Sequence, residues 1–460
     1  MKALEALSDP NLFGDVFGSP TWSNWRTLIG GFYGEPVDRD AFHALTHREP
    51  LSEPAEELWL AVGRRGGKSN IAAFLAVYEA VFNDHRKHLA PGEVATIMVI
   101  AADRKQARTV MRYIRGLLIE NPMLSRLVVR DGVESIELSN RCSIEVMTAS
   151  HRSTRGYTVA AVIMDEIAFW HSEGANPDIE IINAVRPSLT TLGGKLIALS
   201  SPYARRGVLW NNYRRYFGKE GRILVAQAPT LEMNPSLNPA VVIQARAEDP
   251  IAAAAEYDAQ FRTDIETFVS LEALEACVRI GHPELPYSTQ QHYSAFVDPS
   301  GGAVDSFTLC IVHMEGREVV VDLARAVKPP FSPEHVVQEF ADILKEYRIR
   351  SVRGDNYAGE WPKEQFKKRG IQYYRSEKPK SGLYQDLLPL INSGRIEIPN
   401  TPQLINELNG LERRTTRGGR DSIDHAPGAH DDLANAVAGA AVHAAQRERC
   451  ATSIELKIMY

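Results

Sequence analysis

Cysteine is scarce in this chain and is never paired at short spacing. Cys142, Cys277, Cys310 and Cys450 are too far apart for the closely spaced ligand pairs of a zinc site. No stretch has the roughly 18 consecutive apolar residues that a membrane span needs. Residues 1–17 also lack a charged start followed by an apolar run. We therefore expect reduced thiols in a cytosolic compartment, no secretory signal and no membrane contact.

The chain also lacks an excess of basic charge. Lys and Arg total 52 against 58 Asp and Glu, which gives a formal net charge of -6. An acidic total does not exclude a nucleic-acid partner, because phosphates are bound by local basic patches. Low-complexity blocks and internal repeats are absent as well. With 460 residues, of which 44% are hydrophobic, the chain is expected to form two globular domains.

In the first half of the chain, short apolar strands alternate with helices. Strands are predicted at 58–62, 95–101, 159–164 and 195–200, with two more between 134 and 146, and helices at 70–82 and 103–120. Strands that alternate with helices form a mainly parallel sheet covered on both faces. We therefore predict an α/β domain over residues 1–230.

The pattern changes after residue 229. Residues 231–288 are helical and loop-like in character, and are expected to connect two domains. The elements that follow are three closely spaced strands at 293–297, 307–313 and 318–323, a helix at 333–347, a strand at 351–353, two helix–strand units and a last helix at 431–447. Close spacing predicts antiparallel pairing for the first three strands. This order is that of an RNase H-like mixed sheet, predicted over residues 289–450, with residues 451–460 as a tail.

A Gly-rich turn joins the strand at 58–62 to the helix at 70–82. It reads Gly63-Arg64-Arg65-Gly66-Gly67-Lys68-Ser69, in the strand–turn–helix context that a phosphate-binding loop requires. Backbone N–H groups of such a turn bind phosphates together with the helix N-terminus. Lys68 is predicted to reach the β and γ phosphates of a nucleotide, and the Ser69 hydroxyl to bind Mg²⁺.

This loop departs from the usual spacing, which would place its first glycine at Val62. Gly63 and Gly66 are therefore expected to supply the turn. The alternative is a Gly-rich turn that contains an incidental lysine.

A second motif completes the chemistry of nucleotide hydrolysis. The apolar strand at 159–164 ends in Asp165-Glu166. We predict that Asp165 holds Mg²⁺ and that Glu166 orients and deprotonates the attacking water, the alternative being a structural acid at a strand end. Positive charge at the γ-phosphate would stabilise the transition state. The candidate arginines are Arg64, Arg65, Arg152 and Arg155, each of which could instead face solvent or DNA.

Separated carboxylates mark the second half of the chain. Asp298 ends the first predicted strand there, Asp355 ends a later strand, and Asp431 and Asp432 open the last helix. Strand ends and a helix packed across them can bring such acids to one point, where oxygen ligands bind Mg²⁺ or Mn²⁺. Two cations about 3.5–4 Å apart would activate a water and stabilise the leaving 3′ oxygen of a phosphodiester. Taken singly, Asp298 could be a turn residue and Asp431 a helix cap.

These motifs together resemble the large terminase subunits of tailed bacteriophages and related gene-transfer elements. The resemblance spans about residues 59–445. It rests on the loop at 63–69, Asp165-Glu166, Ser200-Ser201-Pro202 as a coupling motif, Asp-Pro-Ser-Gly-Gly at 298–302 with Asp305-Ser306, and His-Asp-Asp-Leu-Ala-Asn-Ala at 430–436. It implies an N-terminal P-loop ATPase fused to an RNase H-like nuclease. Such a packaging motor couples ATP hydrolysis to DNA translocation into a procapsid and cuts concatemeric DNA.

The resemblance also implies ligands, roles and partners. Asp298, Asp355 and Asp432 would be the primary ligands of two Mg²⁺ or Mn²⁺ ions, with Asp431 and Asp305 as secondary ligands. Ser200 and Ser201 would sense the γ-phosphate of ATP and transmit its hydrolysis. The expected partners are double-stranded DNA, a portal protein, a small terminase subunit and further copies of this chain in a ring. The expected place is the host cytoplasm and, transiently, the procapsid.

Contacts to the nucleotide base and to DNA are less marked in the sequence. No glutamine motif for adenine precedes the P-loop, and the nearest candidates, Trp22 and Trp25, could equally be core residues. Phosphate contacts need only Lys or Arg. The basic clusters are Arg205-Arg206, Arg214-Arg215, Lys363 with Lys367, Lys368 and Arg369, Lys378 with Lys380, and Arg413, Arg414, Arg417 and Arg420. The last cluster, in an expected loop beside the metal ligands, is favoured for DNA, whereas the others could be solvated faces.

Two other functions are compatible with the motifs. One is a cellular P-loop helicase or repair ATPase with an inactive RNase H-like domain. The other is a binding or scaffolding protein that uses ATP only as a switch. Glu166 argues against a pure switch because it supplies a catalytic base, and the set of carboxylates argues against an inactive nuclease.

Overall fold

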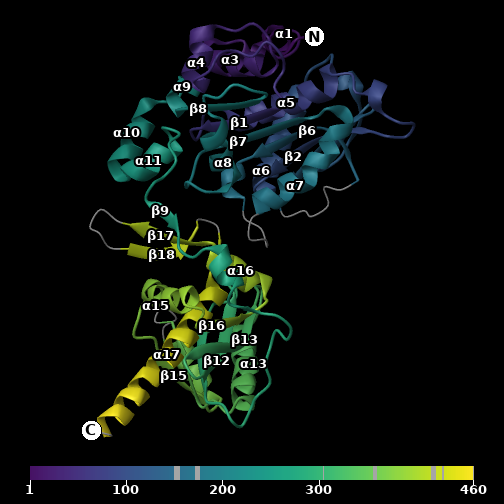
Figure 1. The fold of residues 1–460 in the computed structure, drawn as a ribbon. Coiled ribbons are helices and arrows are strands. Elements are labelled where there is room, and N and C mark those ends of the chain that lie inside the picture. The colour runs from purple at the N-terminus through teal and green to yellow at the C-terminus, as the bar shows by residue number, and fades with distance from the viewer. Residues whose placement is uncertain are drawn as a thin grey trace. The chain divides into compact units, whose positions relative to one another are not determined.

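The computed structural model describes residues 1–149, 156–170, 177–303, 305–355, 360–415, 421–426 and 429–458. The chain divides into two units (Figure 1). Unit 1 contains Met1–Ser172 and Asn176–Thr263, and unit 2 contains Asp264–Tyr460 with Glu173–Ala175. The division falls inside the expected connecting stretch, whose helices α9 (Thr230–Met233), α10 (Pro239–Glu248) and α11 (Pro250–Glu256) belong to unit 1. In the described part of the chain, no helix is long and apolar enough to cross a membrane.

Unit 1 is built on one eight-stranded sheet. In spatial order its strands are β3 (Val128–Asp131), β4 (Ser135–Leu138), β5 (Cys142–Thr148), β2 (Ala95–Ala101), β6 (Thr158–Asp165), β7 (Lys195–Ser200), β1 (Glu57–Val62) and β8 (Ile223–Ala228). Every neighbouring pair from β5 to β8 is parallel, and only β3 and β4 form an antiparallel edge. The predicted mainly parallel sheet is therefore confirmed. Because β7 lies between β1 and β6, the carboxyl ends of these three strands are neighbours.

Helices cover both faces of this sheet (Figure 1). They are α1 (Ala3–Ser8), α2 (Gly14–Phe17), α3 (Ser23–Phe32), α4 (Arg39–Thr46), α5 (Lys68–Phe82) and α6 (Arg104–Leu118) around one core, and α7 (Pro177–Leu189) and α8 (Gly207–Tyr216) around the other. Successive strand residues point to opposite faces. On β1, Leu60 and Val62 therefore enter the first core, whereas Trp59 and Ala61 enter the second. Burial on both faces explains why the strand sequences are continuously apolar.

Unit 2 contains a seven-stranded mixed sheet. Its spatial order is β10 (Val278–Arg279), β16 (Ile396–Pro399), β13 (Glu318–Val327), β12 (Phe307–Glu315), β11 (Tyr293–Asp298), β14 (Ser351–Gly354) and β15 (Gln372–Arg375). β12 is antiparallel to both β11 and β13, whereas β14 is parallel to β11 and to β15. The predicted antiparallel strands and the RNase H-like mixed sheet are confirmed.

The helices of unit 2 again lie on two faces. Helix α13 (Pro333–Glu346) covers one core, whereas α15 (Lys380–Asn392), α16 (Pro402–Asn409) and α17 (Asp432–Ile458) contribute to the other. A separate three-stranded sheet is formed by β9 (Ile265–Thr267), β17 (Leu411–Thr415) and β18 (Asp421–His425). Two expectations need correction here. Arg413 and Arg414 lie on strand β17 rather than in a loop, and the last helix runs to Ile458, beyond its predicted end at residue 447.

A glycine sets the distance between α17 and β11. A Cβ atom at Gly439 would lie only 2.4 Å from Cδ2 of Phe296, far inside normal contact. The absence of a side chain therefore lets α17 approach the sheet at this turn. Asn435 lies four residues earlier, on the same face of the helix, so this approach also brings Asn435 close to the end of β11.

Gly439→Ala is expected to lower the free energy of unfolding by about 1–3 kcal/mol, because the Phe296 ring or the helix must move. Urea unfolding followed by circular dichroism measures this change. Gly382→Ala on α15 is the matched control, because the nearest atom to its new Cβ would be 3.6 Å away. That control should keep or raise stability by up to roughly 1 kcal/mol. An equal loss in both variants would contradict the packing argument.

Candidate nucleotide and metal sites

The Gly-rich loop connects the end of β1 to the start of α5. Gly67 has φ +94°, a conformation that favours glycine. At Gly63 a Cβ atom would lie 2.3 Å from Thr230 Oγ1, and at Gly66 it would lie 2.7 Å from Val62 Cγ1. All three glycines are therefore needed for this turn, and Val62, at the position of the usual first glycine, is the last residue of β1.

The back of the loop is held by the segment after β8 and by an N-terminal helix. Thr230 Oγ1 donates to the Arg64 carbonyl at 2.8 Å, and Asn234 Nδ2 donates to the Arg65 carbonyl at 2.9 Å. Trp25 Nε1 donates to the Gly66 carbonyl at 2.7 Å, and this side chain is only 1% exposed. Of the two interpretations for Trp25, the core residue is the one observed. The N–H groups of Gly63, Arg64 and Gly66 donate to carbonyls of the protein, so a phosphate would meet the N–H groups of the residues that follow, at the start of α5.

Lys68 lies where the ends of three strands meet. Its Nζ donates to Ser201 Oγ at 2.8 Å, after β7, and to the Val62 carbonyl at 3.1 Å, on β1. It also lies 3.4 Å from Oε1 of Glu166, directly after β6. The lysine is 5% exposed. The ammonium group is thus compensated by groups at the ends of β1, β6 and β7 and by the Gly63 carbonyl, 3.3 Å away.

Asp165 forms a buried carboxylate site with Ser69. Ser69 Oγ donates to Asp165 Oδ2 at 3.3 Å, whereas Asp165 Oδ1 is buried and has no hydrogen-bond partner among the described residues. Burial raises the pKa of Asp165 to about 7, and the adjacent Glu166 carboxylate adds to this rise. A hydroxyl beside a carboxylate with one unused oxygen is a donor set that fits Mg²⁺.

Glu166 is turned toward the end of β7 by its backbone. Its φ of +53° is in the left-handed region, which is uncommon for residues other than glycine and is often found at functional sites. Its Oε2 accepts hydrogen bonds from Ser200 Oγ and from the Ser201 N–H, both at 3.1 Å. The structure therefore brings together Lys68, Ser69, Asp165, Glu166, Ser200 and Ser201, as the sequence order alone could not guarantee.

The arginine candidates have different surroundings. Arg64 pairs with Glu256 at 3.0 Å and is 63% exposed on its side chain. Arg65 is exposed, and its side chain has no partner among the described residues. Arg152 and Arg155 lie outside the described residues. Of the two candidates that the structure describes, Arg64 and Arg65, only Arg65 has a guanidinium group without an ion pair among the described residues.

Two acids of unit 2 are joined by an amide. Asn435 Nδ2 donates to Asp298 Oδ2 at 2.7 Å and lies 3.4 Å from Asp355 Oδ2. Burial raises the pKa of Asp298 to about 8, with further contributions from the Asp355 and Asp432 carboxylates, whereas the Asn435 hydrogen bond lowers it. The ends of β11 and β14 thus meet under the first turn of α17, as the predicted convergence requires.

Asp431 and Asp432 face different surroundings. Asp432 Oδ2 accepts from the Ser306 N–H at 2.8 Å, and Asp432 forms with Asp305 and His430 a group whose ligand atoms lie within 4.8 Å of one another. Asp431 instead accepts from Tyr384 OH at 2.8 Å and pairs with Lys380 Nζ at 3.1 Å.

The three predicted primary ligands lie farther apart than the ligands of one shared cation would. In the described chain, the ligand oxygens of Asp298, Asp355 and Asp432 do not all lie within 4.8 Å of one another. The donor set itself, carboxylate oxygens at one edge of the sheet, fits Mg²⁺ or Mn²⁺.

Sequence reasoning assigned no role to two residues at this site. Asn435 belongs to the His-Asp-Asp-Leu-Ala-Asn-Ala motif at 430–436. It follows Asp432 by three residues, a spacing that predicts both side chains on one helix face. Glu407 on α16 carried no local signal. Its carboxylate accepts from the N–H groups of Leu433 at 2.8 Å and Ala434 at 2.9 Å, and so caps the first turn of α17. Burial raises the pKa of Glu407 to about 7.

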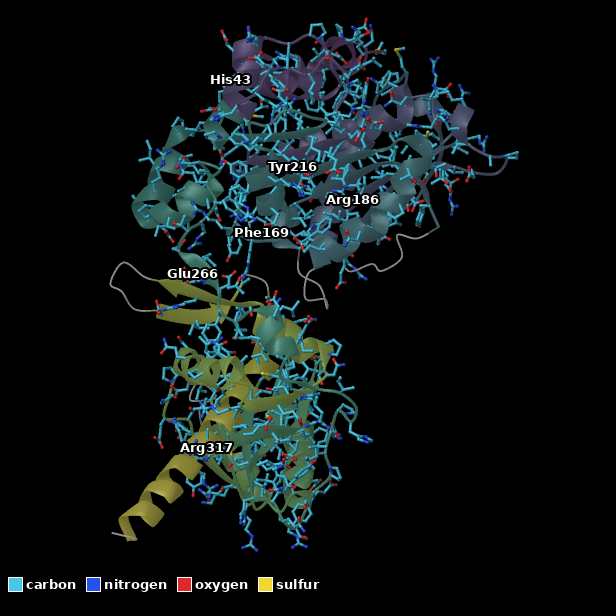
Figure 2. All side chains as sticks on the ribbon, in the orientation of Figure 1. His43, Phe169, Arg186, Tyr216, Glu266 and Arg317 are labelled. Atoms are coloured by element: carbon cyan, nitrogen blue, oxygen red, sulfur yellow. The ribbon has the colours of Figure 1, made fainter. Side chains whose placement is uncertain are left out.

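Many of the predicted DNA-binding cations have partners within their own unit. Arg205 lies over the Trp210 ring, Arg215 lies over the Tyr216 ring (labelled in Figure 2), Lys378 pairs with Asp386, Lys380 with Asp424 and Asp431, Arg413 with Asp421, and Arg414 with Glu412. Arg413 also lies opposite Glu266 of β9 (Figure 2). Arg417 and Arg420 lie outside the described residues. Arg413 and Arg414, the described members of the cluster favoured for DNA, are therefore each paired with an acid.

A basic stripe on α6, which the sequence reading did not single out, differs in this respect. It consists of Arg104, Lys105, Arg108 and Arg112, all exposed and without a side-chain partner among the described residues. Residues 104, 108 and 112 are spaced by four and share one helix face. Basic residues in the first turn of a helix oppose its dipole, so they do not stabilise α6. We define these four residues as the α6 stripe.

No protein-family model and no curated protein matches this chain. Solved structures similar to it are large terminases of bacteriophages, the family that the motifs resemble. The HK97 bacteriophage large terminase is 16% identical with a TM-score of 0.39, over 92% of this chain and 95% of its own. The large terminase of a thermophilic bacteriophage in complex with ATP-gamma-S is 11% identical with a TM-score of 0.40, over 91% and 98%. The large terminase nuclease from thermophilic phage G20c with bound magnesium is 18% identical with a TM-score of 0.32, over 37% and 94%.

Divalent cation binding to unit 2 should depend on pH through Asp298. Since the pKa of Asp298 is about 8 in the metal-free chain, a cation must displace its proton at neutral pH. The Mg²⁺ affinity should rise by up to about tenfold per pH unit from pH 6 to 8 and level off above pH 8. Calorimetric titration of the wild type and of Asp298→Asn at several pH values isolates the part of the pH dependence that comes from Asp298. An affinity that is flat from pH 6 to 8 would contradict the expectation.

The metal-free chain should show the opposite trend in stability. Folding favours protonated Asp298, because its pKa is raised from 3.8 to about 8. Its contribution to the free energy of unfolding is therefore fully present below its unfolded pKa and is lost as the pH rises through about 8.

Proposed function

We propose that this chain is the large subunit of a DNA-packaging terminase, in which unit 1 hydrolyses ATP and unit 2 cuts DNA. The observation that carries the proposal is the set of contacts at the ends of β1, β6 and β7. There the P-loop residues Lys68 and Ser69 contact Asp165, Glu166 and Ser201 directly. A Gly-rich turn with an incidental lysine would have no reason to meet an acid pair and a serine pair on two other strands.

ATP hydrolysis would follow from this arrangement. The N–H groups of the loop and the start of α5 bind the β and γ phosphates, and Lys68 moves from its strand-end partners onto them. Ser69 and Asp165 would hold Mg²⁺, which neutralises charge on the phosphates when bound. Glu166 accepts the proton of the attacking water. Arg65 is the described arginine best able to complete the site, either in its own copy or in a neighbouring copy of a ring.

The same contacts couple hydrolysis to movement. Glu166 and Lys68 both bind Ser201. A γ-phosphate attracts Lys68, so its arrival and loss alter the hydrogen bonds of Ser200 and Ser201. The predicted role of this serine pair as a γ-phosphate sensor is supported by its position between the two motifs.

Unit 2 would be the nuclease. Asp298, Asp355 and Asp432 would hold two Mg²⁺ or Mn²⁺ ions, which when bound activate water and stabilise the leaving 3′ oxygen. Asp305, with His430, would support Asp432. Asp431 is compensated by Lys380 and Tyr384, so its proposed contribution is to position the start of α17 rather than to be a primary ligand.

Double-stranded DNA is the proposed substrate and the portal, small terminase subunit and other copies of the chain are the proposed partners, on a procapsid in the host cytoplasm. The α6 stripe supports the DNA assignment, because four unpaired cations on one exposed helix suit a sequence-independent phosphate contact. The alternative, a cellular helicase with an inactive second domain, gives no reason for Asp298, Asp355 and Asn435 to converge.

Separate variants of the two sites should separate the two activities. Lys68→Ala should reduce ATP turnover by on the order of a hundredfold or more, because it removes charge stabilisation at the phosphates, while metal-dependent plasmid cleavage persists. Asp298→Ala should abolish cleavage with Mn²⁺ or Mg²⁺ and leave ATP turnover intact. The controls are Lys87→Ala and Asp342→Ala, which replace exposed residues of the same types. Loss of both activities in both folded site variants would refute this division of labour.

The α6 stripe should contribute to DNA affinity without sequence preference. Arg108→Glu combined with Arg112→Glu should weaken binding to duplexes of any sequence and reduce the slope of log K against log[salt] by about 1 per lost phosphate contact. Fluorescence anisotropy over a salt series measures both quantities. The double variant Arg86→Glu with Lys87→Glu makes the same charge change at other exposed sites of unit 1. Equal effects of the two double variants would indicate general electrostatics rather than a contact at α6.

A further inference from the structure

The amide of Asn435 is placed between two carboxylates in the interior of unit 2. The residue is 1% exposed. Its Nδ2 lies 2.7 Å from Asp298 Oδ2 and 3.4 Å from Asp355 Oδ2. The strands themselves are paired through their backbones, and this one N–H₂ group links the side chains that follow, those of Asp298 and Asp355.

The other atom of the same amide has no partner. Asn435 Oδ1 is buried and has no hydrogen bond among the described residues. Buried acceptors without a partner are rare in folded proteins because they lose their bonds to water and gain none in exchange. Since Oδ1 and Nδ2 are bonded to the same carbon atom, a half-turn of the amide would put this oxygen in the place that Nδ2 now occupies beside the two carboxylates.

The scaffold holds this amide firmly in place. Glu407 caps the N–H groups of Leu433 and Ala434, directly before Asn435. Gly439, one turn later, lets the helix approach Phe296 on β11, two residues before Asp298. A helix fixed on both sides of Asn435 is what a ligand of defined geometry needs.

We propose that Asn435 is a further ligand residue of the divalent cation site: its N–H₂ group bridges Asp298 and Asp355 when the site is metal-free, and its Oδ1 binds Mg²⁺ or Mn²⁺ when the site is loaded. The exchange needs only a half-turn of the terminal amide, whose nitrogen and oxygen are almost the same size. Amide oxygens are suitable ligands for hard cations. This assignment rests on the proposed nuclease function of unit 2.

A neutral ligand has a specific advantage at this position. Asp298, Asp355 and Asp432 already raise the local negative charge, and a fourth carboxylate would increase their repulsion in the metal-free state. An amide supplies an oxygen to the cation without that charge, and a donor to the acids without the cation. The same residue therefore serves both states of the site.

Mn²⁺ binding to the full chain, measured by calorimetry without DNA or nucleotide, tests the assignment. Asn435→Ala, which removes the oxygen, should weaken Mn²⁺ binding by about tenfold or more. Asn435→Asp, which keeps an oxygen at the same place, should bind Mn²⁺ at least as tightly as the wild type, although its metal-free form should unfold at lower urea concentration. Gln446→Ala, an exposed position on the same helix, is the control and should match the wild type.

The outcomes separate this inference from the function on which it rests. Wild-type Mn²⁺ affinity in Asn435→Ala would show that the residue acts only in folding, and would overturn the assignment. Weaker binding in Asn435→Asp would also overturn it, because the amide N–H and not the oxygen would then be required; this variant decides the matter if Asn435→Ala does not fold. If Asp298→Ala left the Mn²⁺ binding of the wild type unchanged, the proposed nuclease site would fail, and Asn435 with it.

Discussion

A carboxylate that leaves water must be compensated by donors or by a cation, and both candidate sites are organised around this constraint. In unit 1 the buried acid is Asp165, held on one oxygen by the Ser69 hydroxyl. In unit 2 it is Asp298, held by the Asn435 amide. Burial raises both pKa values, to about 7 and about 8. The donors present, the Ser69 hydroxyl and Glu166 N–H at Asp165 and the Asn435 amide at Asp298, therefore do not offset the cost of burying either acid in its charged form.

Each site also has an unused acceptor at the same point, Asp165 Oδ1 in one and Asn435 Oδ1 in the other. Neutral donors beside oxygens without a partner form a donor set that suits a hard cation. The surrounding scaffold keeps these groups from relaxing. The segment after β8 and Trp25 hold the back of the P-loop, and Glu407 and Gly439 hold the first turns of α17. Preorganisation of this kind is what lets charged ligands and cations bind without a large rearrangement.

The sequence was informative wherever a local pattern determined the structure. Continuous apolar runs predicted β1, β2, β6 and β7, and the turn at 63–69 together with Asp165-Glu166 predicted which strand ends would meet. It was not informative where the structure depends on contacts between distant segments. Glu407 reaches α17 from another helix, and the bonds of Thr230 and Asn234 to the P-loop join residues more than 160 positions apart. Arg413 and Arg414 are strand residues because they pair with β9 and β18, neither of which has a strong apolar alternation.

The strand order accounts for how the nucleotide could control the rest of unit 1. Since β7 lies between β1 and β6, a residue directly after β7 is well placed to contact both the P-loop lysine and the acid pair. Ser201 is that residue: its hydroxyl accepts from Lys68 and its N–H donates to Glu166. Under the proposed function, the triphosphate of ATP would compete with Ser201 for the ammonium group of Lys68. Binding of Lys68 to the phosphates would remove a buried charge-assisted hydrogen bond from Ser201, and the end of β7 would then need another arrangement. The arrival or loss of the γ-phosphate would in this way change the conformation of the polypeptide that follows β7.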